Sequence, residues 1–294
     1  GLMDPRVGEG NFFVPGGSLT SQAQADALRQ MIPVIETTTG LLYHGSIAGN
    51  GQNTNNWYNN TVVPNYYYRA AVSYVTGTHN VKVGFNRTHG YQEQRVYQFQ
   101  PYSYQFTNGV PNQVTVWAYP LESGANIDND LGLFVQDRVT LDRWTFSGGL
   151  RFDTLQTSFP EQHAGPAPLV PNRNITFPAQ DNLDWKDFSY RSAAAWDVFG
   201  TGKTAVKITL NKYLQSQGFF GLGTSPSPVN TLVTSANRSW NDNFFGPGDP
   251  RRGNFVPDCV LDASVPGANG ECGALSSSAF GVVNALPAAT FSED

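Results

Sequence analysis

The chain has little charge for its length. Asp, Glu, Lys and Arg make up 14% of its 294 residues, whereas about 25% is usual in soluble domains. The formal net charge is −5, and the densest basic spot is the pair Arg251 and Arg252. Nothing in this balance favours nucleic acid as a partner, because nucleic-acid binding depends on many Lys and Arg contacts to phosphates.

Long apolar runs are also missing. No run approaches the roughly 20 residues of a membrane-spanning helix, which excludes the helical membrane proteins. Membrane barrels stay possible, because their strands need only about 9–11 residues of alternating polarity. The first residues, Gly1 to Asp4, show no basic region, apolar core or cleavage site of a signal peptide. Because an outer-membrane protein needs that signal, we expect an internal fragment of a longer chain.

The usual signs of an enzyme are absent from the sequence too. The four histidines are scattered over loops and strand ends: His44, His79, His89 and His163. No nucleophile elbow or metal-binding helix is recognisable. The segment from Gly200 to Thr204 looks like the end of a phosphate-binding loop, but a strand follows where that motif needs a helix. We predict no enzymatic activity and no cofactor.

Aromatic residues, Gly and Pro are plentiful instead. The chain holds 19 Phe, 13 Tyr, 30 Gly and 19 Pro. Aromatic residues favour strands, and Gly and Pro favour turns and loops. The composition therefore predicts an all-β fold with long polar connections.

Three segments alternate in polarity with the period of two that indicates a strand hairpin. They cover residues 66–85, 131–153 and 190–211, with short turns at 76–78, 142–143 and 199–202. In the second hairpin Leu131, Leu133, Val135 and Val139 share one face, which Asp137 interrupts. Alternation on both arms fixes the register, because a slip of one residue would exchange the two faces.

Much longer connections separate the hairpins. Residues 95–129 contain two further strand-like pieces, 102–106 and 113–119, joined at Asn108-Gly109, and residues 154–187 are rich in proline. Short turns on one rim and long loops on the other are typical of outer-membrane barrels. The sequence thus predicts an antiparallel transmembrane β-barrel with long extracellular loops. The hairpins supply six spans, two more are expected between them, and the chain would form part of a larger barrel.

The chain divides into three parts. Residues 1–61 are predicted to be a loop-rich N-terminal segment, residues 62–214 to hold the barrel hairpins, and residues 215–294 to form a long extracellular loop segment. One short helix is expected from Ser21 to Ile32, with Ser21 as its N-cap.

At this point the residues resemble a known family. Residues 130–138 (DLGLFVQDR) and 149–153 (GLRFD) look like a barrel hairpin of TonB-dependent receptors, and residues 186–191 (KDFSYR) with 196–205 look like the next one. The stretch from about Tyr66 to Cys272 is similar to Oar-like receptors, which carry a carboxypeptidase-regulatory-like domain. The loop that starts at Pro160 and the segment NFVPDC at 254–259 add to this likeness.

The resemblance implies a bacterial outer-membrane protein with a barrel of 22 strands gated by a plug domain. Its partners would be outer-membrane lipid, the plug and the TonB system, and it would take up or sense a small-molecule, glycan or peptide ligand with energy from the inner membrane. The sequence shows no plug, no TonB box and no regulatory-like domain. It also ends on Asp294 rather than on the aromatic residue of a closing strand.

Several side chains are candidates for special roles. The two cysteines, Cys259 and Cys272, could close a surface loop as a disulfide or stay as unpaired thiols. Asp242, Asp249 and Asp258 gather oxygen ligands in a Gly-rich loop and are weak candidates for a calcium site. Candidates for the aromatic girdles of a membrane barrel are Tyr66, Tyr68, Tyr74, Trp144 and Trp196. No ligand-binding residues can be named.

Charged residues within the strands should avoid lipid, because an Arg or Lys on the lipid face costs about 2–4 kcal/mol at mid-depth. They are expected to face the lumen or lie near a rim: Arg69, Asp137, Arg138, Arg151, Asp153, Arg191, Asp197 and Lys207. Asp137 shares a face with apolar neighbours and fits only near the turn at Asp142.

A second class of protein shares these patterns. A soluble or surface-exposed β-sandwich for adhesion or glycan binding also has strands with one apolar face. The regular exchange of short turns and long loops, together with the resemblance, favours the barrel.

Overall fold

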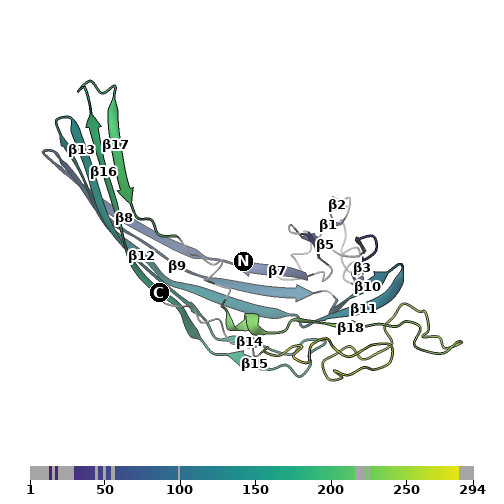
Figure 1. Ribbon diagram of the computed structural model, residues 1–294. Helices are drawn as coiled ribbons and strands as arrows, with labels where there is room; N and C mark the ends of the chain where they lie inside the picture. The colour runs from purple at the N-terminus through teal and green to yellow at the C-terminus, as the bar shows by residue number, and fades with distance from the viewer. Residues whose placement is uncertain are drawn as a thin grey trace.

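The computed structural model describes residues 30–43, 57–98, 100–215, 223 and 226–284, together with the paired segments 13–14, 17–18, 46–48 and 51–53. The described chain is almost entirely antiparallel β-structure. One large curved sheet makes up most of it, and a smaller sheet lies at the end far from the short turns (Figure 1).

The large sheet has the strand order β17-β16-β13-β12-β9-β7, with β8 also paired to β9. Every pairing in it is antiparallel. Its strands are β7 (Trp57–Val62), β8 (Asn65–Thr76), β9 (His79–Gln98), β12 (Leu121–Leu141), β13 (Trp144–Phe159), β16 (Gln180–Asp197) and β17 (Ala205–Asn211). The three predicted hairpins are therefore present, in an order along the sheet that follows the chain.

β7 and β8 lie end to end along the same edge of β9. β7 pairs with residues 93–98 and β8 with residues 79–90. The break between them is at Val63 and Pro64, and proline has no N–H to contribute to a ladder. The Pro64 carbonyl still accepts a hydrogen bond from Tyr91 N, so β7 and β8 continue one line.

All three hairpin turns gather at one end of the large sheet (Figure 1). Gly77 and Asp142 take the left-handed backbone conformation in the first two turns, with φ of 54° and 49°. In the third, the Asp197 carboxylate accepts hydrogen bonds from Gly200 N and Gly202 N at 3.0 and 2.7 Å. The segment that looked like a phosphate-binding loop is thus a hairpin turn closed by Asp197.

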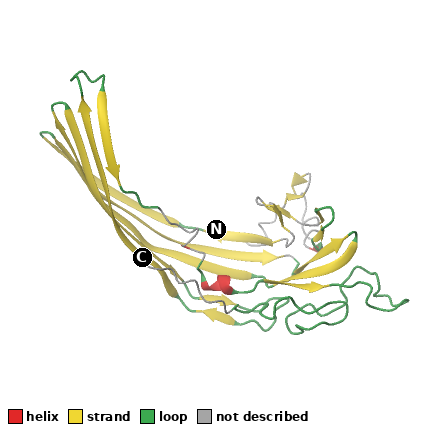
Figure 2. Cartoon of the chain, viewed as in Figure 1, coloured by secondary structure: helices red, strands yellow, loops and turns green. Residues whose placement is uncertain are grey.

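The strands are longer than their alternation predicted. β12 has 21 residues, and at roughly 3.3 Å per residue it is roughly 70 Å long. Residues 121–129, 154–159 and 180–187, which the sequence placed in connections, belong to strands. These stretches carry little alternation, so the polarity pattern alone did not mark them as strands. Figure 2 shows the strands running along the whole sheet and the long loops collected at the far end.

The two extra spans predicted between the hairpins are wrong. Residues 102–106 and 113–117 lie in strands of a separate five-stranded sheet, ordered β18-β11-β10-β3-β4. Its strands are β3 (Val34–Glu36), β4 (Leu41–Tyr43), β10 (Tyr102–Thr107), β11 (Val110–Trp117) and β18 (Ser235–Ser239). β3 and β10 are parallel, whereas the other pairs are antiparallel. The predicted turn at Asn108-Gly109 joins β10 to β11.

The remaining described elements are short. They are β1 (Phe13–Val14), β2 (Gly17–Ser18), β5 (Ser46–Ala48), β6 (Gly51–Asn53), β14 (Gln162–Ala164), β15 (Ile175–Phe177) and the 3-10 helix η3 (Pro228–Thr231). Of the helix predicted at 21–32, residues 21–29 lie outside the described residues, Gln30 is helical, and Met31 and Ile32 are not.

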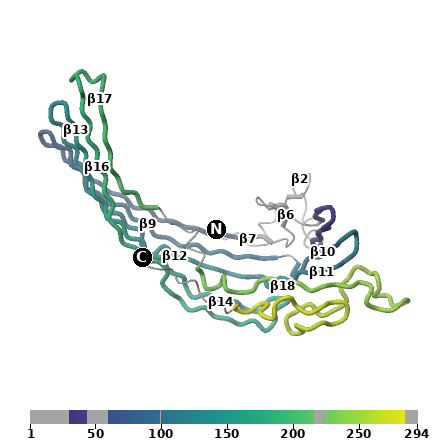
Figure 3. Tube along the Cα trace, in the orientation of Figure 1, coloured from purple at the N-terminus to yellow at the C-terminus, as the bar shows by residue number. Residues whose placement is uncertain are grey.

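The main core lies at the smaller sheet rather than under the large one. Residues 240–284 run back and forth beside β18 (Figure 3), and residues 160–173 contribute Ala167, Leu169 and Val170 to the same core. We call these two segments together with the five-stranded sheet the distal lobe. Its buried apolar cluster includes Tyr104, Val114, Val116, Trp240 and Phe280. Val114 and Val116 are completely buried, so the lobe has a packed interior of its own.

Candidate membrane-facing wall and distal lobe

The register of the large sheet places its apolar side chains on one face. Leu133, for example, lies beside Phe85 on β9 and Phe152 on β13, and Phe152 lies beside Phe188 on β16. We call this side the apolar face. The large side chains that are exposed on it, from the short turns to this row, are Val72, Tyr74, Val83, Phe85, Leu133, Val135, Leu141, Trp144, Phe146, Leu150, Phe188, Tyr190, Trp196, Val206, Ile208 and Leu210.

This apolar face is open to the surroundings. Val72 keeps 73% of its accessible surface and Ile208 keeps 69%. A contiguous exposed apolar surface of this extent indicates contact with an apolar partner or a membrane. A β-sandwich would instead cover it with a second sheet, and no such sheet is present among the described residues.

Aromatic side chains mark both ends of the apolar face. Near the short turns Trp144 and Trp196 are direct cross-strand neighbours and stack with their ring centroids 5.4 Å apart. At the other end Tyr66 and Tyr68 lie against the ring of His89, at 5.0 and 5.7 Å between centroids. The register also puts Tyr74 on this face, so all five girdle candidates share one side of the sheet.

The opposite face carries the charges and small polar side chains. Seven of the eight charged strand residues that were expected to avoid lipid alternate with the apolar ones and therefore lie here. They are Arg69, Arg138, Arg151, Asp153, Arg191, Asp197 and Lys207. We call this side the polar face.

Two glycines on the polar face make room for large neighbours. A Cβ at Gly132 would lie within 2.8 Å of both Arg151 and Asp153, whose side chains form an ion pair of 2.7 Å. A Cβ at Gly84 would lie 2.6 Å from the ring of Phe134. Phe134, the large apolar residue that alternation put on this face of β12, therefore covers a glycine on the next strand.

Asp137 is the exception among the charged residues, and the structure gives it a partner. It shares the apolar face with Val135 and Val139, and its Oδ2 lies 2.6 Å from His79 Nδ1. His79 is the first residue of β9 after the turn. The pair thus lies toward the rim of short turns, as the sequence required, while Asp137 Oδ1 is buried and has no hydrogen-bond partner in the described structure.

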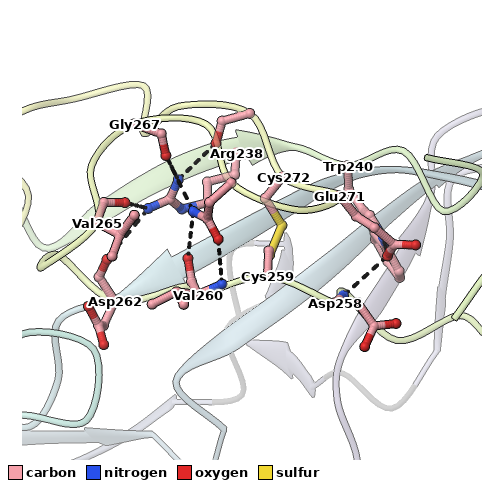
Figure 4. Close-up of a disulfide and its surroundings, with 12 residues drawn as sticks. Arg238, Trp240, Asp258, Cys259, Val260, Asp262, Val265, Gly267, Glu271 and Cys272 are labelled. Carbon is pink, nitrogen blue, oxygen red and sulfur yellow. Dashed lines mark hydrogen bonds between the residues drawn. A yellow bond between two sulfur atoms is a disulfide. The ribbon is translucent and has the colours of Figure 1, made fainter. Parts of the chain in front are cut away.

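A buried arginine holds the loops of the distal lobe together (Figure 4). Arg238 on β18 is fully buried. Its guanidinium donates to the carbonyls of Gly267 and Gly273 at 3.0 and 2.8 Å, and to those of Asp262 and Val265. Burial lowers the pKa of Arg238, but arginine stays charged in proteins. Four carbonyls from one loop therefore converge on one cation.

A second arginine also donates to several backbone carbonyls. Arg173 donates to the carbonyls of Gly165, Ala118 and Pro120 at 2.6, 2.6 and 2.8 Å. It thereby ties the Pro-rich connection after β13 to the chain between β11 and β12. Burial also lowers the pKa of Arg173.

The turn between β10 and β11 is held by a carboxylate. Glu36 on β3 accepts hydrogen bonds from Thr38 N and Asn108 N at 3.0 Å and from Gly109 N at 2.8 Å. These backbone donors, that of Thr38 first, lower the pKa of Glu36. One buried carboxylate therefore closes two turns whose chain positions are about seventy residues apart.

Cys259 and Cys272 are bonded to each other in the structure, with 5.8 Å between their Cα atoms. Beside the bridge, Glu271 Oε2 accepts hydrogen bonds from Trp240 Nε1 and Asp258 N, both at 3.1 Å (Figure 4). The bridge therefore lies next to the indole that packs in the core of the lobe.

The three calcium candidates have separate partners. Asp249 forms an ion pair with Arg251, which lowers the pKa of Asp249 to about 2. Asp242 accepts from Phe255 N, and burial raises its pKa. Asp258 accepts from the side chain of Asn254. Among the described residues no three His, Cys, Asp or Glu side chains are placed to share a metal ion.

Sequence reasoning missed the two buried arginines and the partner of Asp137. The contacts of Arg238 span 24 to 35 positions along the chain, and their acceptors are backbone carbonyls that any residue provides. His79 and Asp137 are 58 positions apart. The hairpin register could have brought these two together, but no local pattern points to either arginine.

No helix within the described residues has the length and apolarity to cross a membrane. Comparison with curated proteins and with solved structures found no significant match. A family model does match: the TonB dependent receptor-like β-barrel, over residues 17–255. This match covers most of the chain and agrees with the long antiparallel strands and their short turns. The chain belongs to the TonB-dependent receptor β-barrel family.

Proposed function

We propose that this chain forms part of the wall of an outer-membrane receptor that takes up or senses a ligand with energy supplied from the inner membrane. The apolar face would meet lipid, and the polar face would line the lumen and meet the plug domain. The observation that carries the proposal is the single apolar face that continues across β8, β9, β12, β13, β16 and β17.

The height of the apolar face fits a membrane. From Leu141, beside Trp144, to Leu131, beside Arg87, β12 advances ten residues. At roughly 3.3 Å per residue and a tilt of roughly 40°, that corresponds to roughly 25 Å along the membrane normal. The apolar band of an outer-membrane barrel is also about 25 Å tall. The remainder of each long strand, with the distal lobe, would then stand outside the membrane.

The distal lobe is the part that would meet external molecules first. Its loops are fixed by Arg173, Arg238 and the disulfide, so it would offer a preformed surface rather than one that orders on binding. The motifs at residues 160–173 and 254–259, which support an Oar-like receptor, both belong to this region.

The membrane orientation can be tested with two neighbouring residues on opposite faces. Leu150 lies on the apolar face and Gly149 on the polar face. Each would be replaced by cysteine in the full-length protein, labelled with a fluorophore and placed in bilayers containing brominated lipid. We expect the label at 150 to be quenched by lipid and the label at 149 to be quenched mainly by aqueous iodide. Equal iodide quenching of both would refute the barrel and favour the soluble β-sandwich.

A further inference from the structure

The outer edge of the apolar face carries cations in place of apolar side chains. Two residues beyond Phe85 on β9 lies Arg87, and two residues before Phe188 on β16 lies Lys186. The register puts both on the apolar face, in one row with Leu131 and Thr154. These are the first basic side chains met on this face on leaving the apolar band.

Arg87 is held in place and is exposed. Its Nε donates to Asn129 Oδ1 at 2.9 Å. Asn129 lies in the β12 bulge opposite β9. Such a bulge re-aims a side chain out of the regular ladder, and here it supplies the acceptor. No carboxylate among the described residues lies within salt-bridge distance of Arg87, so its charge is not neutralised by an acid.

Aromatic and imidazole groups lie on the same face as Arg87, in its own row and the next. Tyr68 is the direct cross-strand neighbour of Arg87. In the next row, Tyr66 is the direct cross-strand neighbour of His89. The His89 ring lies against both tyrosines, and His89 Nδ1 is buried without a hydrogen-bond partner in the described structure. Tyrosine rings at this level place an apolar body toward the acyl chains and a hydroxyl toward the headgroups.

Lys186 is a second cation in the same row, and it already has an acidic partner. It forms an ion pair of 3.2 Å with Asp184, in which both side chains are more than half exposed. An exposed ion pair of this kind contributes little to stability, so Asp184 would compete poorly with another anion for Lys186. Arg87 and Lys186 lie three strands apart, roughly 14 Å at the usual spacing between strands, so each would bind its own phosphate.

We propose that Arg87, supported by Tyr66, Tyr68 and His89, and Lys186 bind phosphate groups of anionic lipids at the outer edge of the apolar face. The inference rests on the proposed orientation of the wall, because the row lies at headgroup level only if the apolar face meets acyl chains. Both charge complementarity and continuity with the lipid-facing surface point to a lipid rather than to a soluble anion. Each basic residue near a charged membrane surface strengthens such binding by a factor of about five.

The test uses the full-length protein in a zwitterionic detergent, titrated with phosphatidic acid and, in parallel, with phosphatidylcholine. Bound lipid is counted by native mass spectrometry. The double variant Arg87→Gln/Lys186→Gln should bind phosphatidic acid about 25-fold more weakly and should bind phosphatidylcholine as the unaltered protein does. The matched control is Arg138→Gln/Lys207→Gln, which removes the same charge from the polar face and should stay within about twofold of the unaltered protein.

Three results would overturn the proposal: no preference of the unaltered protein for phosphatidic acid, equal losses in both double variants, or displacement of the lipid by inorganic phosphate at equal concentration. The last result would indicate a site for free phosphate. The label at residue 150, measured in the same variants, separates this failure from failure of the membrane orientation. If lipid quenches the label while phosphatidic acid shows no preference, only the lipid site is wrong.

Discussion

His79 Nδ1 lies 2.6 Å from Asp137 Oδ2, on the face of the sheet that otherwise presents apolar side chains. A carboxylate on a lipid-facing surface is destabilising by an amount that depends on its depth. Here the imidazole of the neighbouring strand satisfies one carboxylate oxygen, and the pair lies toward the rim of short turns.

Removing the imidazole of His79 should reveal how much the Asp137 carboxylate destabilises the apolar face. In the full-length protein in lipid, we expect His79→Leu to lower the free energy of unfolding by about 1–3 kcal/mol, because Asp137 then keeps no partner for either oxygen. Adding Asp137→Leu should recover most of the loss. Urea unfolding of the two single variants and the double variant gives the coupling energy. Additive effects of the two substitutions would mean that the contact contributes nothing.

The sequence predicts the half of a long strand next to the short turns better than the half beyond it. Residues 131–141 alternate apart from Phe134 and Asp137, because one face of this segment is apolar and the other is polar. Residues 121–129 belong to the same strand but carry polar residues on both faces and a bulge next to Asn129. Alternation therefore predicts where the two faces of a strand differ in polarity, and it gives no signal where both faces carry polar residues.

The distal lobe was the least predictable region for a different reason. Its sheet joins β3, β10, β11 and β18 from distant parts of the chain, and its loops are fixed by backbone carbonyls around Arg173 and Arg238. Neither feature leaves a periodic signal. The cysteine pair was visible because only two cysteines occur, and the turn at Asn108-Gly109 was visible because these residues favour left-handed backbone conformations.

A charge placed on the apolar face should test the wall directly. Leu150→Arg introduces a cation in the middle of the apolar face. We expect it to make folding into lipid bilayers less favourable by about 2–4 kcal/mol. Ser147→Arg, three residues away on the polar face, is the matched control and should cost much less. Folding titrations in lipid vesicles measure both. Similar costs at the two positions would contradict the assignment of the faces.

The Arg238 cluster should be sensitive to the loss of its charge. Arg238→Met keeps an apolar stem but leaves four carbonyls without their donor, so we expect the free energy of unfolding of the lobe to fall by about 1–3 kcal/mol. Arg251→Met removes an exposed pair with Asp249 and should destabilise the lobe much less. Limited proteolysis of residues 255–275, followed by mass spectrometry, reports the opening of the lobe. Equal cleavage rates in the two variants would show that Arg238 does not hold the loops.

The disulfide between Cys259 and Cys272 should stabilise the same loop independently of Arg238. It closes a loop with a sequence separation of 13, for which chain-entropy arguments give about 3 kcal/mol. We expect the double variant Cys259→Ser/Cys272→Ser to increase amide exchange in residues 255–275 and to leave exchange in β12 and β13 unchanged. Reduction of the unaltered protein should give the same pattern. If exchange in the loop does not change, the bridge adds no stability to the lobe.

The Glu36 carboxylate should make the β10–β11 turn sensitive to acid. Its pKa is lowered in the folded protein, so its contribution to stability is complete above the ordinary carboxyl pKa and is lost as the pH falls through the lower, folded value. We therefore expect amide exchange at Asn108 and Gly109, corrected for the intrinsic rate, to increase at acidic pH. Glu36→Gln should already show the faster exchange at neutral pH and lose the dependence on pH. Glu122→Gln removes an exposed carboxylate that pairs with Arg95 and should leave the turn unchanged. A pH dependence that survives in Glu36→Gln would assign the effect to another group.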